Sequence, residues 1–74
     1  MPENQTNPIE IIVNGEPRSV PPGLTVAALL AHLGVEAGRV AVELNHQIVR
    51  KPAWTETRVE AGARVEIVQF VGGG

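Results

Sequence analysis

The residues with the clearest chemical potential are the last three of the chain, Gly72, Gly73 and Gly74. Glycine has no side chain to pack and the greatest backbone freedom, so we expect this segment to be flexible. Fully extended, three residues reach roughly 10 Å, and so slender a peptide can enter an enzyme channel in which side chains would clash. The reactive group would be the α-carboxylate of Gly74. A frayed tail or a leftover linker is the alternative interpretation.

Catalytic and metal-binding groups are scarce in the rest of the chain. There is no cysteine, and the histidines, His32 and His46, fall in different predicted elements. The helix dipole explains a histidine in a last helical turn, and turn chemistry explains the other. Neither a metal cluster nor a nucleophile–base pair is evident. From the residues alone we therefore expect that the chain is not itself an enzyme and that it binds no cofactor or metal of its own; as a protein with a reactive end it could be a covalent substrate.

Composition sets the class of protein. Seventy-four residues suffice for one small domain, and without cysteine its stability must come from a core built from the 43% of hydrophobic residues. A formal net charge of −2 argues against a nucleic-acid partner, which usually requires a concentrated basic surface. No apolar run approaches the ~20 residues of a membrane span, and no signal peptide is evident. We therefore expect a soluble cytoplasmic protein.

The first predicted hairpin covers residues 9–20. Apolar residues alternate through 9–13, which is the period of a β-strand. Asn14-Gly15 follows, and both residue types accept the positive φ angles of a type I′ turn. The return strand is expected over 16–20. Because Pro17 has no N–H to donate, we expect this strand to lie at an edge of the sheet.

One helix is clearly predicted, over residues 25–33. Thr25 is expected to cap its N-terminus, Leu24 and Leu29 match a hydrophobic staple, and Gly34 is the natural left-handed end. Apolar side chains recur at the spacing i, i+3, i+4 and i+7. They are Val26, Leu29, Leu30 and Leu33.

The second half of the chain predicts three more strands. The first covers 40–44, and a turn at 45–47 leads to a short strand at Ile48-Val49. Trp54, in an irregular stretch, is interpreted as a plug over the end of the sheet, with its indole N–H bonded to a carbonyl. The last strand is predicted over 64–71, with apolar residues on both faces. Such a strand is either central in the sheet or carries an apolar surface for a partner.

This order of elements predicts an α+β fold. A helix that follows the first hairpin can act as a crossover, which lets the last strand lie parallel beside the first. The result is a mixed sheet of four to five strands with one main helix packed across it, the β-grasp layout. We expect a flexible extension at 1–8, the domain at 9–71 and a flexible glycine tail at 72–74.

Several segments together resemble the ThiS family of sulfur carriers, which are ubiquitin-like β-grasp proteins of thiazole biosynthesis. The resemblance covers nearly everything from residue 9 to 74, and the terminal Gly-Gly alone is shared with other ubiquitin-like carriers. The segments that carry it are Asn14-Gly15-Glu16, the helix at 25–33, the strand at 40–45, Ile48-Val49, Trp54 and the ending Ile67-Val68-Gln69-Phe70-Val71-Gly72-Gly73-Gly74.

The resemblance implies a chemistry for the chain end. In such carriers, a ThiF-type activating enzyme uses ATP and Mg²⁺ to adenylate the terminal glycine, here Gly74. Sulfur delivered by a persulfide donor protein then displaces the adenylate and gives a thiocarboxylate. A ThiG-type thiazole synthase takes that sulfur into the thiazole precursor of thiamine. Gly72 and Gly73 would enter the active site of the partner.

Partners are expected to recognise more than the tail. Our hypothesis is that Phe70 and Val71 dock onto the partner, because the last strand has more apolar residues than a one-sided core requires. The other interpretation of Phe70 is a plain core residue.

Other functions remain open from the residues alone. A MoaD-like small subunit of molybdopterin synthase, or a carrier for cysteine or another sulfur metabolite, would use the same chemistry. A ubiquitin-like modifier would use the same terminus to form isopeptide bonds with lysines. An interaction domain with an inert tail would use neither.

Overall fold

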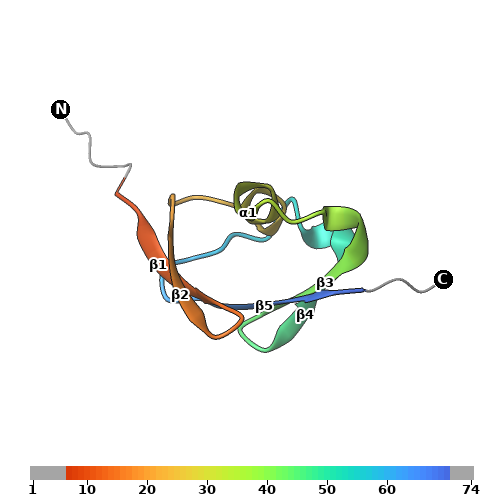
Figure 1. Ribbon diagram of the computed structural model, residues 1–74. Helices are drawn as coiled ribbons and strands as arrows, with labels where there is room; N and C mark the ends of the chain where they lie inside the picture. Colours follow the sequence, from red (N-terminus) through yellow and green to blue (C-terminus); the bar gives the residue numbers. More distant parts are fainter. Residues whose placement is uncertain (1–6, 71–74) are drawn as a thin grey trace.

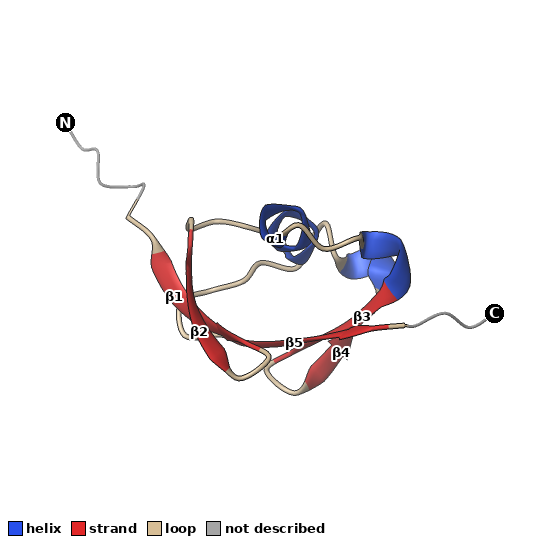
Figure 2. Ribbon diagram, in the orientation of Figure 1, coloured by secondary structure: helices blue, strands red, loops and turns tan. Residues whose placement is uncertain are grey.

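The computed structural model describes residues 7–70, which form a curved five-stranded sheet with one α-helix lying across one face (Figures 1 and 2). The order of the strands is β2-β1-β5-β3-β4. In chain order the elements are β1 (Ile9–Val13), β2 (Glu16–Val20), α1 (Val26–Leu33), a short 3-10 helix (Ala37–Arg39), β3 (Val40–Leu44), β4 (Gln47–Val49), a second 3-10 helix (Lys51–Ala53) and β5 (Arg64–Gln69).

The pairing of β5 confirms the predicted α+β, β-grasp topology. This last strand lies in the centre of the sheet, parallel to β1 and antiparallel to β3. The parallel pair requires a crossover between its two strands, and α1 lies within that connection. Because β1 and β5 run in the same direction, the last residue of β5 and the first residue of β1 lie at opposite ends of the strands (Figure 1).

The first hairpin forms as predicted. Asn14 and Gly15 have φ angles of 51° and 83°, the positive values that a type I′ turn requires. Pro17 lies in β2, which is the outermost strand on this side of the sheet. Its missing N–H therefore leaves no gap in the interior of the ladder.

Local signals at both ends define α1. The Thr25 side chain accepts a hydrogen bond from the Ala28 N–H at 3.2 Å, and Gly34 ends the helix with a φ of 76°. The apolar face turns toward the sheet, where Leu29 and Leu30 are almost completely buried. Packing of this face, rather than the intrinsic stability of eight residues, holds the helix in place.

The core lies between α1 and the sheet. Its buried members are Ile11, Val20, Val26, Leu29, Leu30, Val40, Val42, Trp54, Val59, Ala63 and Val65. Trp54 closes one end as predicted, with 4% of its surface exposed. Its indole N–H donates to the Val49 carbonyl at 2.8 Å, so the buried polar atom is satisfied.

The structure differs from the sequence predictions at three places. The turn before β4 is one residue shorter, because only Asn45 and His46 take positive φ angles, and Gln47 already belongs to the strand. The stretch after β4 contains the 3-10 helix Lys51–Ala53, where the fixed φ of Pro52 suits a first helical turn. Finally, β5 ends at Gln69. The predicted boundaries at residues 1–6 and 71–74 lie outside the described residues, and Asn7 and Pro8 are exposed and precede β1.

We expect Leu29→Ala to reduce the free energy of unfolding by about 2–5 kcal/mol, because the side chain is fully buried and its loss leaves a cavity. Urea denaturation monitored by circular dichroism measures this. Ile48→Ala is the matched control, since that side chain is 72% exposed and its loss should cost at most about 0.5 kcal/mol. Equal losses in the two variants would contradict the assignment of the core.

Candidate functional site

The candidate site is the place where the chain leaves the sheet. Beyond Gln69, the N–H of Phe70 still donates to the Arg39 carbonyl at 2.8 Å. This bond continues the β3 side of the sheet by one residue and holds the chain in line with β5. Phe70, the last described residue, is therefore held at the end of the central strand.

The two faces of β5 differ in burial, and the strand is central in the sheet, one of the two alternatives that the sequence left open. Val65 is 1% exposed and Ile67 packs against the core, both on the side of α1. Val68 and Phe70 alternate with them and are 57% and 58% exposed. Exposure of this size rules out the interpretation of Phe70 as a core residue. The residue stands on the open face of the sheet, the face away from α1.

An apolar patch surrounds this exit. Ala41 is the β3 partner of Val68, so the two side chains lie on the same face. Ile48 on β4 lies one diagonal step further and is 72% exposed. We define the apolar patch as Ala41, Ile48, Val68 and Phe70. Exposed apolar groups gathered on one sheet face beside a chain end are typical of a docking surface.

Sequence reasoning missed Ile48 as a member of this patch. A signal was nevertheless present, because Ile48 and Val49 are adjacent in a strand and only one of them can face the core. The sheet register shows which one does: Val49 pairs with the buried Val42, and Ile48 pairs with Glu43.

Two carboxylates lie beside the patch. Glu43 on β3 and Glu66 on β5 are direct partners in the antiparallel register, and both are half-buried on the open face. Like charges directly opposite one another in a sheet destabilise it. The open face thus combines an unfavourable charge pair with exposed apolar side chains, neither of which helps the chain to fold.

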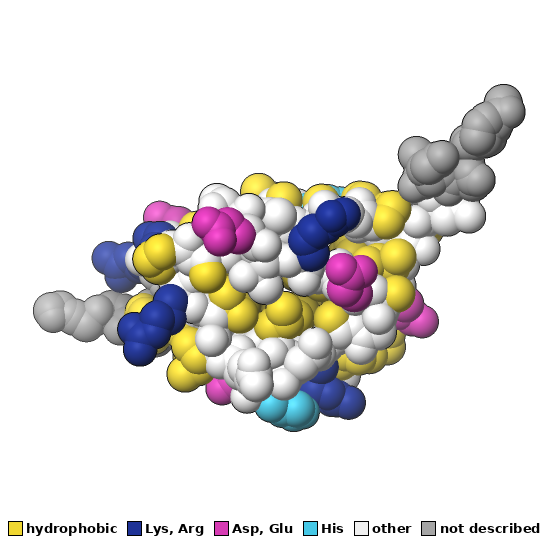
Figure 3. Space-filling view, turned by 180° about the vertical axis from the view of Figure 1, so that it is seen from behind, with side chains coloured by type: hydrophobic (Ala, Val, Ile, Leu, Met, Phe, Trp, Pro, Cys, Tyr) yellow, Lys and Arg dark blue, Asp and Glu magenta, His cyan; other side chains and the backbone are white. Residues whose placement is uncertain are grey.

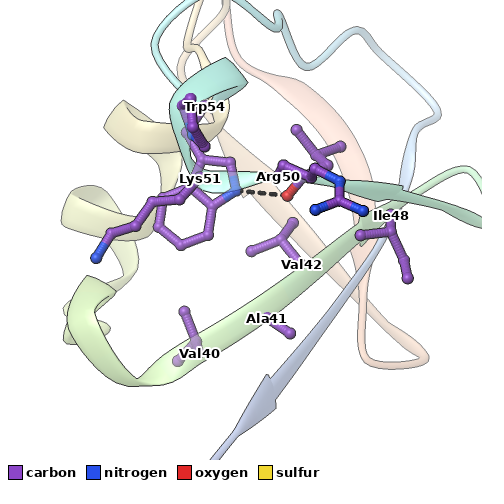
Figure 4. A pocket seen from close by; sticks show the side chains of 9 residues that line it. Val40, Ala41, Val42, Ile48, Arg50, Lys51 and Trp54 are labelled. Carbon is purple, nitrogen blue, oxygen red and sulfur yellow. Dashed lines mark hydrogen bonds between the residues drawn. The ribbon is translucent and has the colours of Figure 1, made fainter.

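A hollow of about 340 Å³ lies where β4 ends, next to the apolar patch, and Ala41 and Ile48 of the patch line part of it (Figure 4). Val40, Val42 and Trp54 line it, with Arg50 and Lys51 at its margin. The Lys51 ammonium lies 5.9 Å from the centre of the Trp54 ring, within the range of a cation–π contact. These apolar walls and cationic groups suit an apolar group that bears a negative charge. Within residues 7–70, no three side chains of metal-ligating type come together.

The predicted site residues fall into two groups. Phe70 is exposed beside the chain exit, which agrees with the docking hypothesis without testing it. Val71, Gly72, Gly73 and Gly74 lie outside the described residues, so the expectation of a reactive chain end stays a prediction.

Surface charge and hydropathy are consistent with this description. On the side shown in Figure 3, some Lys and Arg side chains lie near one another at one end of the molecule and others stand singly, among apolar and acidic side chains. In the part of the chain that the structure describes, no helix is long and apolar enough to cross a membrane.

The mixed sheet, the single covering helix and the strand that ends beside an apolar patch define a ubiquitin-like β-grasp domain. A family model described as "ThiS family" matches residues 11–74, which is most of the chain. The chain belongs to the ThiS family, as its sequence motifs indicated.

Solved structures agree with this assignment. The crystal structure of the thiamine biosynthesis protein ThiS from Geobacter metallireducens superimposes with a TM-score of 0.80 at 39% identity. The match covers 89% of this chain and 100% of that one. A solution structure of a thiamine biosynthesis protein from the same organism gives a TM-score of 0.76 at 38% identity.

Curated relatives are of two kinds. A protein named thiazole synthase from Paramagnetospirillum magneticum is 44% identical over 66 residues, and one from Magnetococcus marinus is 35% identical. The chain spans only about a fifth of the length of these two synthases, while 89% of the chain itself is matched. The ycf40 protein of Porphyra purpurea is 33% identical, and there the match covers 93% of the relative.

We expect Glu66→Gln to raise the free energy of unfolding by about 0.2–1 kcal/mol, because it removes one of two like charges that face each other across β3 and β5. Thermal unfolding at low ionic strength measures this best, since salt screens the repulsion. Glu60→Gln makes the same change of net charge at an exposed position outside any strand and should shift stability less. Equal shifts in both variants would indicate an effect of net charge alone.

Proposed function

We propose that this protein is a sulfur carrier whose C-terminal Gly74 is converted to a thiocarboxylate for thiazole formation in thiamine biosynthesis. Membership of the ThiS family and the likeness to the ThiS structure support this proposal. The structural observation that carries it is the end of β5. Phe70 is held in line with the sheet beside an exposed apolar patch, so a partner that covers the patch also meets the last described residue of the chain.

The chemistry follows from the poor reactivity of a carboxylate at neutral pH. A ThiF-type enzyme would use ATP and Mg²⁺ to form an acyl-adenylate at Gly74, with pyrophosphate leaving. The terminal sulfur of a persulfide donor protein would attack the activated carbonyl, and AMP would leave. Cleavage of the resulting acyl disulfide by a thiol would then release the thiocarboxylate. This chain has no cysteine, so it would act throughout as a substrate and not as a catalyst.

The recipient of the sulfur is proposed to be a ThiG-type thiazole synthase. The two relatives named thiazole synthase support this, because each contains a stretch similar to most of this chain within a protein about five times as long. In those proteins a domain of this kind is covalently joined to the rest of the synthase. The present chain would present its tail to a comparable enzyme by docking.

The intact mass of the protein tests the carrier chemistry. We expect a gain of about 16 Da, for one oxygen replaced by sulfur, after incubation with a ThiF-type enzyme, ATP, Mg²⁺ and a persulfide donor. Deletion of Gly74, or addition of a serine after it, should abolish the gain while the circular dichroism spectrum stays unchanged. No mass gain with demonstrably active enzyme would refute the proposal. Attachment to lysines of other proteins would instead indicate a modifier, and selective support of molybdopterin synthase a MoaD-like role.

Phe70→Ala tests the docking surface. We expect the KM for the carrier in the activation reaction to rise roughly tenfold, as for the loss of an aromatic anchor from an interface. Because the side chain is 58% exposed, the free energy of unfolding should change by at most about 0.5 kcal/mol. Phe70→Leu keeps an apolar side chain at the position, so its KM should lie between those of the wild type and Phe70→Ala. Activation of a folded Phe70→Ala variant at the wild-type rate would exclude this docking role.

A further inference from the structure

The side chain of Asn14 extends the sheet where the backbone of β1 stops. Only two positions of β1 pair with β5, and the last of them joins Val13 to Val65. The chain then turns away, and the N–H of Asn14 donates to the Val65 carbonyl at 2.8 Å. In residues 7–70, no strand accompanies β5 on this side beyond that point.

The Asn14 amide takes the place of the missing strand. Its Oδ1 accepts a hydrogen bond from the Ile67 N–H at 2.7 Å, and its Nδ2 donates to the Ile67 carbonyl at 3.2 Å. A side-chain amide carries the same donor and acceptor as a peptide group, so it can satisfy both backbone groups of one strand residue. One residue thereby bonds to β5 through its main chain and its side chain.

These bonds lie close to the exit of the chain. Ile67 is three residues before Phe70, and on the β3 side the last positions are held by the Val40–Gln69 pair and the bond from Phe70 to Arg39. On the β1 side, the Asn14 amide makes the last hydrogen bonds to β5 among the described residues. Without it, the end of β5 would be hydrogen-bonded only on its β3 side.

We propose that Asn14 is a positioning residue that holds the end of β5, up to Phe70, in one direction beside the apolar patch. The importance of that direction rests on the proposed function, in which enzymes receive the residues that follow Phe70 in the sequence. When only a fraction of molecules presents a competent conformation, the apparent affinity falls by that fraction. Loss of the amide should therefore weaken recognition of the carrier without changing the reactive group.

Asn45 provides a matched control at the other end of the same strand. It also occupies a hairpin turn with a positive φ, 52° against 51° for Asn14. Its Oδ1 accepts from the Arg64 N–H at 2.9 Å, at the start of β5. Glycine accepts a positive φ without strain, so Asn14→Gly and Asn45→Gly each remove a side-chain contact to β5 and keep the turn.

Amide hydrogen exchange at Phe70 tests the local effect, because the acceptor of this N–H, the Arg39 carbonyl, is untouched in both variants. We expect Asn14→Gly to accelerate exchange at Phe70 about fivefold over Asn45→Gly, because Asn14→Gly removes two side-chain hydrogen bonds to β5, close to Phe70, and Asn45→Gly removes one at the far end of the strand. Thermal unfolding of both variants gives the correction for any difference in global stability. Equal exchange rates at Phe70 after that correction would overturn the proposal.

Activation kinetics test whether binding by a partner enzyme depends on the fixed position of the end of β5. With a ThiF-type enzyme, the KM of Asn14→Gly should rise about fivefold at an unchanged kcat, while Asn45→Gly should resemble the wild type. Faster exchange at Phe70 with an unchanged KM would overturn the positioning role. A wild-type protein that is never adenylated would refute the proposed function, and exchange at Phe70 would still decide whether Asn14 holds the strand.

Discussion

The position of β5 between β1 and β3 is the constraint on which the rest of the structure depends. Its parallel pairing with β1 requires a crossover, and the helix in that crossover supplies the apolar face that covers the sheet. Its antiparallel pairing with β3 continues up to the point where the chain leaves. The start of β1 and the end of β5 therefore lie at opposite ends of the sheet. The described chain ends at the end of its central strand.

The two faces of β5 differ in what they contribute: one face packs into the core, and the other would meet a partner in the proposed function. Val65 contributes to the core, while Val68 and Phe70 are more than half exposed and gain little from folding. The opposed carboxylates of Glu43 and Glu66 on the open face work against folding. Such features are understandable in a domain whose open face is covered by a partner, where exposed apolar area is buried and charge is compensated by the partner surface.

A domain of this size is only marginally stable, so local interactions supplement its core. The indole N–H of Trp54 and the cap at Thr25 each find a partner, and no buried side-chain polar atom among residues 7–70 is left without one. Asn14 and Asn45 combine a left-handed turn conformation with side-chain bonds to β5. The hairpin turns thus fix the central strand as well as reversing the chain.

The sequence by itself determined the α-helix, the strands, their order and the family, because alternation, the Asn14-Gly15 turn and the capped helix are local signals. It also predicted the edge position of β2 from Pro17 and the plugging role of Trp54. Only the tertiary structure decided that Phe70 is exposed, that Ile48 joins it on one face, and that Glu43 opposes Glu66. The physical reason is that strand register and the choice of face depend on contacts between residues distant in the chain, and no local pattern encodes them.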